Sequence, residues 1–274
     1  MKKSGLETAK MAIDNNIPFL YHYQPYSRDY LEKLLSEKTI HCSNPQYFND
    51  PWDCKPSFDS SLLKDPDELQ KAREYLINKI QLNPTINIDL LNELSEGGTG
   101  SRVQIEKIIT SVYEARPETL AKGFRIYCLT PDSTNSLMWA HYADKHKGIC
   151  LEFDSTTRLF GGAWQVKYNN IYPEYRFYEN SDPMFELIHK SDIWEYENEY
   201  RIVSREPTGN PDFDDSPLGS IQGILKLPEN SLTSIIVGCD APYREISDVV
   251  RALAPDVKIK RAVRIPHRYS IEIE

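Results

Sequence analysis

Residues 125–153, RIYCLTPDSTNSLMWAHYADKHKGICLEF, decide the fold class of this chain. The segments 125–129 and 148–153 are short runs rich in apolar, β-branched and aromatic residues, which is typical of buried strands. Between them, a turn rich in Ser, Thr, Asn and Pro leads into residues 135–144, which favour a short helix. The stretch therefore predicts a strand, a helix and a second strand, in that order.

The alternation of strands and helices continues on both sides of this stretch. Upstream, an aromatic strand at residues 18–23 precedes a helix that is capped by Ser27 or Asp29. Clustered strands with helices inserted between them predict an α+β fold, a single compact domain with a mixed or antiparallel sheet core. Further strands are predicted at residues 39–43, 164–168, 199–203, 221–227, 234–237, 257–264 and 269–273, helices at 184–190 and 242–253, and a Pro-, Asp- and Gly-rich loop at 205–219.

A largely helical insertion is expected at about residues 62–122, within one domain of residues 1–274. Pro66 occupies the first-turn position of its first predicted helix. Ile105 and Ile109 have the spacing of one face of a later, amphipathic helix. Because the apolar content of this segment is modest, we expect an insertion between strands and not a separate domain.

The composition describes an acidic globular chain. Its 274 residues include 32 Lys and Arg against 41 Asp and Glu, a net charge of −9, which argues against wrapping duplex nucleic acid through a basic face. A membrane span needs about 18 consecutive apolar residues, and no such run occurs. The amino end also has no apolar region of a signal peptide. We therefore expect a cytoplasmic protein without a membrane partner.

The usual sequence motifs of metal and dinucleotide sites do not occur. The five cysteines include no CxxC pair, so no metal is predicted. Cys128, Cys150 and Cys239 lie in apolar, strand-like runs, where a thiol behaves as a small buried hydrophobic group. GxGxxG, GxxxxGK[ST], GxSxG and HExxH are missing, so dinucleotide binding of the Rossmann kind is not expected.

The acidic segment at residues 197–201 is the first candidate for chemistry. If a strand begins near Glu197, its period of two places Glu197, Glu199 and Arg201 on one face. Neighbouring carboxylates raise each other's pKa and an adjacent guanidinium lowers it, which is one way to set an acid/base pair. The alternative is a solvent-exposed strand face with mixed charges.

Two histidines with aromatic neighbours are further candidates. His141 shares a predicted helix with Trp139 and Tyr142, after a turn whose hydroxyls and amides suit a ligand. His22 lies on the first strand, on the opposite face from Tyr23. In both cases the alternative is a packed, hydrogen-bonded histidine.

Two blocks of the sequence are distinctive, MWAHYAD at residues 138–144 and ENEYR at residues 197–201. Together with the other blocks, and in this order, they resemble an uncharacterised bacterial family, domain of unknown function 2971 (DUF 2971). The resemblance spans roughly residues 18–240, and it implies a role in phage conflict, since the family looks like one found near mobile and defence genes. The other blocks are LYHY at 20–23, SNP at 43–45, FNDP at 48–51 and YCLT at 127–130.

The order of these groups is also similar to that in the ADP-ribosyltransferase fold. This resemblance implies that NAD is the co-substrate, that His22 holds it, and that Tyr127 and Thr130 frame it. It implies that Glu199 is catalytic and stabilises the oxocarbenium-like transition state as nicotinamide leaves, while Glu197 positions the acceptor. The sequence departs from the pattern after Tyr127, where CLT replaces a Ser-Thr-Ser triplet. The rest of the expected NAD-binding set is Tyr23, Trp139, His141, Tyr142 and Arg201.

Two other classes of function stay open. The first is a metal-dependent nuclease or nucleotide hydrolase that uses Glu197, Glu199, His141 and Asp144. The second is a non-enzymatic module that binds a ligand or partner in a pocket of aromatic side chains. The expected partner is a small-molecule nucleotide or a macromolecular acceptor. The aromatic residues of the second alternative are Trp52, Trp139, Tyr142 and Trp194.

Overall fold

Strand β4 (Ile149–Asp154) is buried along almost its whole length in the computed structural model, as its apolar residues predict, and it also holds the buried Glu152. β1 (Phe19–Gln24) pairs antiparallel with one edge of β4, and β10 (Leu232–Val237) pairs antiparallel with the other. β11 (Lys258–Arg264) then runs parallel to β10, and β12 (Ile271–Ile273) pairs antiparallel with β11. This mixed sheet has the order β1-β4-β10-β11-β12. The structure describes residues 9–55, 58–82, 88–96, 98–171, 176, 178, 183–207 and 218–274.

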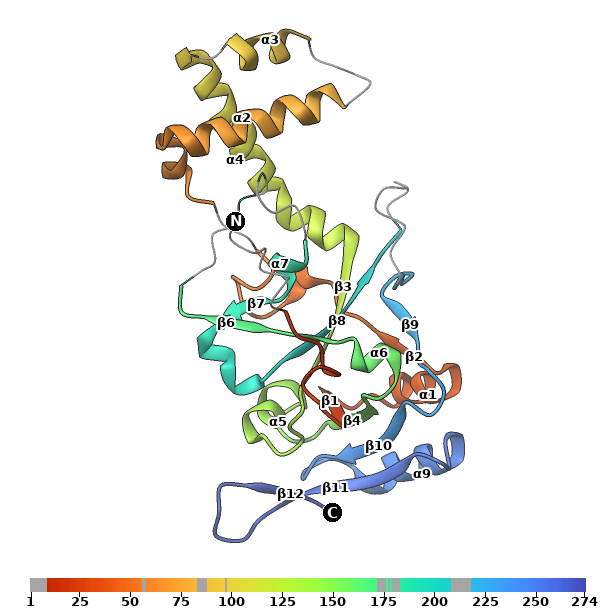
Figure 1. Cartoon of the computed structure of the whole chain (residues 1–274). Helices are drawn as coiled ribbons and strands as arrows, with labels where there is room; N and C mark the ends of the chain where they lie inside the picture. Colours follow the sequence, from red (N-terminus) through yellow and green to blue (C-terminus); the bar gives the residue numbers. More distant parts are fainter. Residues whose placement is uncertain are drawn as a thin grey trace.

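A second, antiparallel sheet has the order β3-β8-β5 and meets the first sheet near β1 (Figure 1). Its strands are β3 (Phe124–Leu129), β8 (Tyr200–Arg205) and β5 (Trp164–Gln165). The link between the sheets is a bridge in which the backbone N–H groups of Tyr21 and Thr130 donate to each other's carbonyl oxygens, at 2.7 and 2.9 Å. The two sheets therefore meet at one seam, between β1 and the end of β3.

Helices α1 (Arg28–Glu37) and α9 (Tyr243–Leu253) pack against each other and against one face of the first sheet. Ser27 caps α1, and its hydroxyl accepts a hydrogen bond from the backbone N–H of Tyr30, as one of the two predicted caps. α5 (Ser136–Tyr142) packs on the opposite face of that sheet. Both faces are therefore covered, which explains the burial of β4.

Helices α2 (Pro66–Gln81), α3 (Ile88–Glu96) and α4 (Gly98–Gly123) lie away from the first sheet, at the top of Figure 1. They occupy most of the segment 62–122, in which helices were predicted. They have an apolar cluster of their own. Its buried members are Leu63, Ala72, Leu76, Leu94, Ile105, Ile109 and Tyr113.

The prediction of a helix over residues 184–190 is wrong at its end. Helix α7 (Met184–Leu187) stops early, and β7 (His189–Ser191) pairs parallel with β6 (Lys167–Asn169). Lys190 therefore belongs to a strand, whose extended backbone directs its side chain into the interior. Most of the predicted loop at 205–219 lies outside the described residues. The remaining elements are β2 (Thr39–His41), β9 (Ile224–Lys226), α6 (Arg158–Gly161) and the 3-10 helices η2 (Pro45–Tyr47), η3 (Ser60–Lys64) and η4 (Asp192–Glu197).

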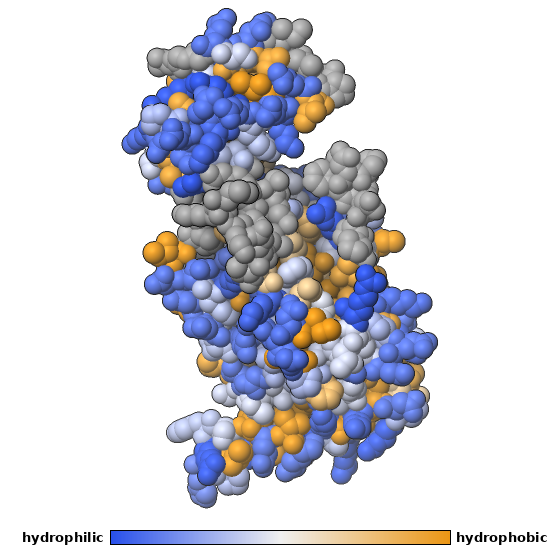
Figure 2. All heavy atoms as spheres, in the orientation of Figure 1, coloured by the Kyte–Doolittle hydropathy of each residue, from blue (hydrophilic) through white to orange (hydrophobic). Residues whose placement is uncertain are grey.

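The chain has an α+β fold with mixed sheets, so the predicted fold class is confirmed. Figure 2 shows one face of the molecule, on which hydrophobic residues lie in small groups among hydrophilic ones. In the described part of the chain, every helix is too short or too polar to cross a bilayer.

Candidate functional site

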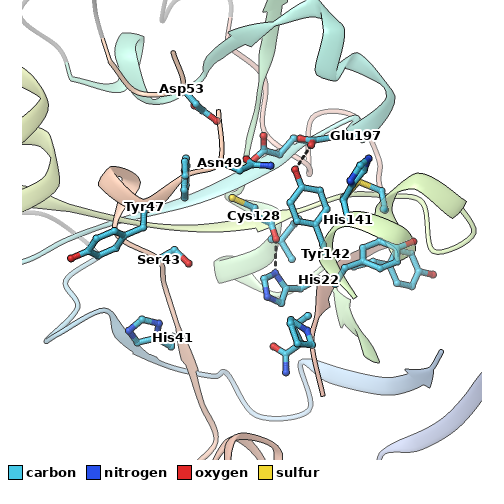
Figure 3. Close-up of a pocket in the computed structure, with 18 of the residues that line it drawn as sticks. His22, His41, Ser43, Tyr47, Asn49, Asp53, Cys128, His141, Tyr142 and Glu197 are labelled. Carbon is cyan, nitrogen blue, oxygen red and sulfur yellow. Dashed lines mark hydrogen bonds between the residues drawn. The ribbon is translucent and has the colours of Figure 1, made fainter. Parts of the chain in front are cut away.

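A cavity of about 570 Å³ opens at the seam between the two sheets. Its size falls within the range of small-molecule sites, which is about 300–1,000 Å³. Aromatic rings, histidines and acidic side chains converge on it from elements far apart in the sequence (Figure 3). Its lining includes Tyr21, His22, Tyr23, Tyr47, Phe48, Asn49, Asp53, Cys128, His141, Tyr142, Lys190, Glu197 and Glu199.

The two predicted catalytic glutamates both line this cavity, but they do not share a strand. Glu197 is the last residue of η4, and Glu199 immediately precedes β8. Asn198 between them adopts a left-handed conformation, with φ of 44°. Asparagine tolerates this conformation better than most residues. The left-handed backbone of Asn198 changes the direction of the chain between the two glutamates. The prediction of a strand from Glu197 is therefore wrong, although both carboxylates still reach the cavity.

Arg201 fixes Glu199 in place from behind the cavity wall. The guanidinium is fully buried and donates to both oxygens of Glu199, Nε to Oε1 at 2.8 Å and Nη2 to Oε2 at 2.9 Å. It also donates to both oxygens of Asp53, at 2.9 and 2.6 Å, and to the carbonyl oxygen of Leu187 at 2.7 Å. Such bidentate pairs fix geometry strongly. Arg201 does not line the cavity, so it orients Glu199 and does not meet a ligand there.

Lys190 lies among the three carboxylates of the wall. Its Nζ is 2.5 Å from Oε2 of Glu197, 3.2 Å from Oε2 of Glu199 and 3.7 Å from Oδ2 of Asp53. Asp53, Lys190, Glu197, Glu199 and Arg201 together form what we call the ion cluster. None of its members exposes more than 8% of its surface. The alternative of a solvent-exposed strand face at residues 197–201 is therefore wrong.

The ion cluster moves the pKa values of its two glutamates in opposite directions. Burial alone would raise the pKa of Glu199, but the charges of Arg201 and Lys190 outweigh it and lower that pKa to about 2. For Glu197, burial and the negative charge of Glu199 raise the pKa despite Lys190 and the hydroxyl of Tyr142. Glu199 is thus a fixed anion, and Glu197 is the carboxyl that exchanges a proton more readily.

Tyr142 connects the ion cluster to helix α5. Its hydroxyl donates to Oε1 of Glu197 at 2.6 Å, shown as a dashed line in Figure 3. Burial and the charge of Glu197 raise the pKa of Tyr142, so its hydroxyl keeps its proton and stays a donor. Both oxygens of Glu197 therefore have a donor within the protein, one from Tyr142 and one from Lys190.

His22 enters the cavity from β1 (Figure 3). Its ring stacks on Tyr127 with 4.0 Å between the centroids, and its Nδ1 lies 2.7 Å from the carbonyl oxygen of Cys128. The thiol of Cys128 in turn hydrogen-bonds to Glu199. Burial lowers the pKa of His22 to about 4, against the opposing effect of the Cys128 carbonyl. His22 is therefore neutral near pH 7, with the Nδ1 proton donated to Cys128.

The structure brings together six of the predicted site residues and leaves the other four outside the cavity wall. Tyr127 is buried behind His22, and Thr130 is buried in the bridge to Tyr21. Trp139 is buried against Tyr23, with its ring edge-on and 5.1 Å between centroids. Arg201, as described above, is the fourth. The six that line the cavity are His22, Tyr23, His141, Tyr142, Glu197 and Glu199.

Asp53 and Lys190 are members of the ion cluster that the sequence does not predict as site residues. Asp53 comes from the loop after η2, and Lys190 comes from a segment predicted as helix. Each forms its contacts through tertiary structure, since Asp53 and Arg201 are 148 residues apart. The signal in the sequence is the acidic and aromatic loop at residues 49–53, which predicts a turn or a pocket wall formed by Phe48 and Trp52, and not a source of charged groups.

The residues predicted for the two alternative functions, a hydrolase and a binding module, reach the cavity only in part. Asp144 of the hydrolase set does not line the cavity. Among the described residues, no group of three or more His, Cys, Asp and Glu is arranged to hold a metal ion. Of the aromatic residues of the binding module, Tyr142 alone reaches the cavity, and Trp52 is 60% exposed.

Comparison with protein-family models, curated proteins and solved structures found no match for this chain. The resemblances to DUF 2971 and to the ADP-ribosyltransferase fold therefore stay predictions.

Proposed function

We propose that this chain is an ADP-ribosyltransferase-like enzyme that binds NAD at the cavity and cleaves its bond between nicotinamide and ribose. The observation that supports this most is the pair of glutamates at one cavity wall, one with a lowered pKa and one with a raised pKa. Enzymes that break glycosidic bonds use two carboxyl groups of this kind in different roles. A cytoplasmic location, where NAD is present, belongs to the same proposal.

In this mechanism Glu199 stabilises charge. As the bond between C1′ of the ribose and the pyridinium nitrogen breaks, its electron pair stays with the nitrogen and neutral nicotinamide leaves. Positive charge then develops on the ribose, and the fixed anion of Glu199 faces it. Arg201 holds both oxygens of Glu199, so the carboxylate does not have to reorganise. Preorganised charge of this kind is worth roughly 3–4 kcal/mol of the barrier.

Glu197 accepts the proton of the acceptor. A hydroxyl, amine or water attacks C1′ from the open side of the cavity, and its proton passes to the Glu197 carboxylate as the new bond forms. A carboxyl with a raised pKa is the better base of the two, since a group with a pKa near 2 holds a proton too weakly. This step assigns different roles to Glu197 and Glu199.

Calorimetric titration with a non-cleavable NAD analogue tests binding without knowledge of the acceptor. We expect saturable binding to the wild type at micromolar to low-millimolar concentration. Nicotinamide release from NAD is then measured in the wild type, in Glu199→Gln and in Glu206→Gln. Glu206 is a buried glutamate outside the cavity wall, so it is the matched control.

We expect Glu199→Gln to release nicotinamide about a hundredfold more slowly than the wild type, and Glu206→Gln to match the wild type. Heat no larger than dilution for both the wild type and Glu206→Gln contradicts the proposal. Binding of the analogue without any nicotinamide release, in the wild type and with water or protein acceptors, favours the non-enzymatic binding module instead.

A further inference from the structure

We propose that the cavity takes a positively charged N-riboside, the nicotinamide riboside half of NAD, and that no phosphate enters it. This inference rests on the proposed function and specifies which part of the substrate the site recognises. The diphosphate and the adenosine half of NAD then lie outside the cavity mouth.

The charge of the cavity wall is the first argument. Among the described residues that line it, Lys190 is the only lysine or arginine, and it lies within 3.7 Å of all three acidic side chains. Counting buried Arg201 as well, the ion cluster has three carboxylates against two cations, so a negative excess faces the ligand. In a low-dielectric site this excess repels a phosphate and attracts a pyridinium ring.

The hydrogen-bonding capacity of His22 is the second argument. Since Nδ1 donates to the carbonyl oxygen of Cys128, the neutral ring has only an acceptor, Nε2, left for a ligand. A ribose hydroxyl donates a hydrogen bond and fits this acceptor. A deprotonated phosphate has acceptors alone and does not fit. His22 is therefore suited to the sugar and not to the diphosphate.

The aromatic wall is the third argument. Phe48 lines the cavity, and its ring lies 5.5 Å from the guanidinium carbon of Arg201, so this ring already has one cation beside it. Tyr47, the residue before Phe48, also lines the cavity and is 80% exposed. Aromatic faces favour a cationic ring over an uncharged ring of the same shape. A pyridinium therefore gains more from this wall than a neutral ring does.

Four probes test the inference on the wild-type protein by titration calorimetry. The first is a carbocyclic analogue of nicotinamide riboside, which keeps the positive ring and cannot be cleaved. The second is its 5′-phosphate, and the third is the non-cleavable NAD analogue. The fourth is benzamide riboside, which has nearly the same shape without the ring charge. Glu206→Gln is titrated in parallel as a control for folding.

We expect the carbocyclic riboside to bind at least as tightly as its 5′-phosphate, and about tenfold more tightly than benzamide riboside. Affinity that rises tenfold or more with the phosphate overturns the inference and leaves the proposed function intact, because NAD then binds through its phosphates. Equal affinity for benzamide riboside and the charged riboside also overturns it. Heat no larger than dilution with all four probes contradicts the proposed function itself.

Discussion

The two ends of strand β8 each have a buried glutamate, and the protein holds the two in different ways. Glu199, just before the strand, is held by the cations Arg201 and Lys190. Glu206, just after the strand, accepts hydrogen bonds from neutral groups of the turn at residues 218–223. These are the hydroxyl of Ser220 at 2.5 Å and the backbone N–H groups of Gln222 and Gly223, each at 2.8 Å.

The difference shows which buried acids belong to a site and which hold the fold. At Glu206, burial raises the pKa, but the hydrogen bonds from Ser220 and Gly223 outweigh it, and the carboxylate anchors a turn to the strand. At Glu199, the partners are charged, two more carboxylates crowd the same cations, and a cavity opens beside them. Burial of an acidic residue is therefore weak evidence for a functional site, whereas excess charge beside a cavity is strong evidence for one.

The largest effect that separates the two ends is expected from Arg201→Met. This change leaves Asp53 and Glu199 buried without their common partner, and we expect the free energy of unfolding to fall by about 3–5 kcal/mol. Urea unfolding followed by circular dichroism measures it, beside Glu206→Gln. If Arg201→Met costs less than Glu206→Gln, the ion cluster does not hold this part of the fold together.

Glu197→Gln tests the acid/base role at the cavity end of the strand. Glu197 acts as a base only when ionised, and its pKa is raised above the ordinary value of 4.5. Wild-type nicotinamide release is thus expected to fall as the pH is lowered, with a midpoint above 4.5. We expect Glu197→Gln to be about a hundredfold slower at pH 7 and to lack this dependence. A Gln variant with the wild-type rate and pH profile contradicts the assignment, and Glu206→Gln serves as the control.

Acid unfolding separates Glu199 from an ordinary surface glutamate. Its pKa of about 2 in the folded protein lies below that of an unfolded glutamate, so its ionised form stabilises the fold above about pH 4.3, and this contribution is lost as the pH falls toward 2. The contribution is on the order of 2–3 kcal/mol. Urea unfolding at pH 6, 4 and 3 is expected to show a smaller loss for Glu199→Gln than for the wild type. Parallel losses in the two proteins would show that Glu199 does not keep its charge through its ion pairs.

The smallest effect is expected from a change of Glu206, at the other end of β8. Glu206→Gln replaces one acceptor oxygen by a donor, which leaves a backbone N–H of the turn without a partner. We expect a loss of about 1–2 kcal/mol in the free energy of unfolding, with affinity for the NAD analogue unchanged. Thermal unfolding and calorimetry on the same sample measure both. Weaker binding of the analogue in this variant would mean that the two ends of β8 are coupled.

The strands of the core could be predicted because their signal is local. Residues 148–153 are apolar except for Glu152, and the structure buries all of them. The contact of Glu199 with Arg201 was also predictable, because residues two apart on a strand share a face. The position of Glu197 was not, since the single left-handed residue Asn198 changes the direction of the chain and leaves no periodic pattern.

The rest of the site depends on contacts that no local pattern encodes. Lys190 is buried because three carboxylates surround it, and none of them is visible as its partner in the sequence. Asp53 meets Arg201 only in the folded chain, where Ser43 bridges to Ile126 of β3 and β3 pairs with β8. Such buried charges are tolerated only in the assembled cluster, so helix and strand propensities do not predict them.

Arg201 is synthesised 148 residues after Asp53, its partner in the ion cluster. At about 5–20 residues per second, a ribosome needs about 7–30 s to travel from one to the other. During that interval the nascent chain contains Asp53 without Arg201, its buried partner. Strands β10, β11 and β12 of the first sheet are made later still. A chain truncated before β8 therefore contains Asp53, Lys190, Glu197 and Glu199 but lacks Arg201, the cation that joins Asp53 to Glu199.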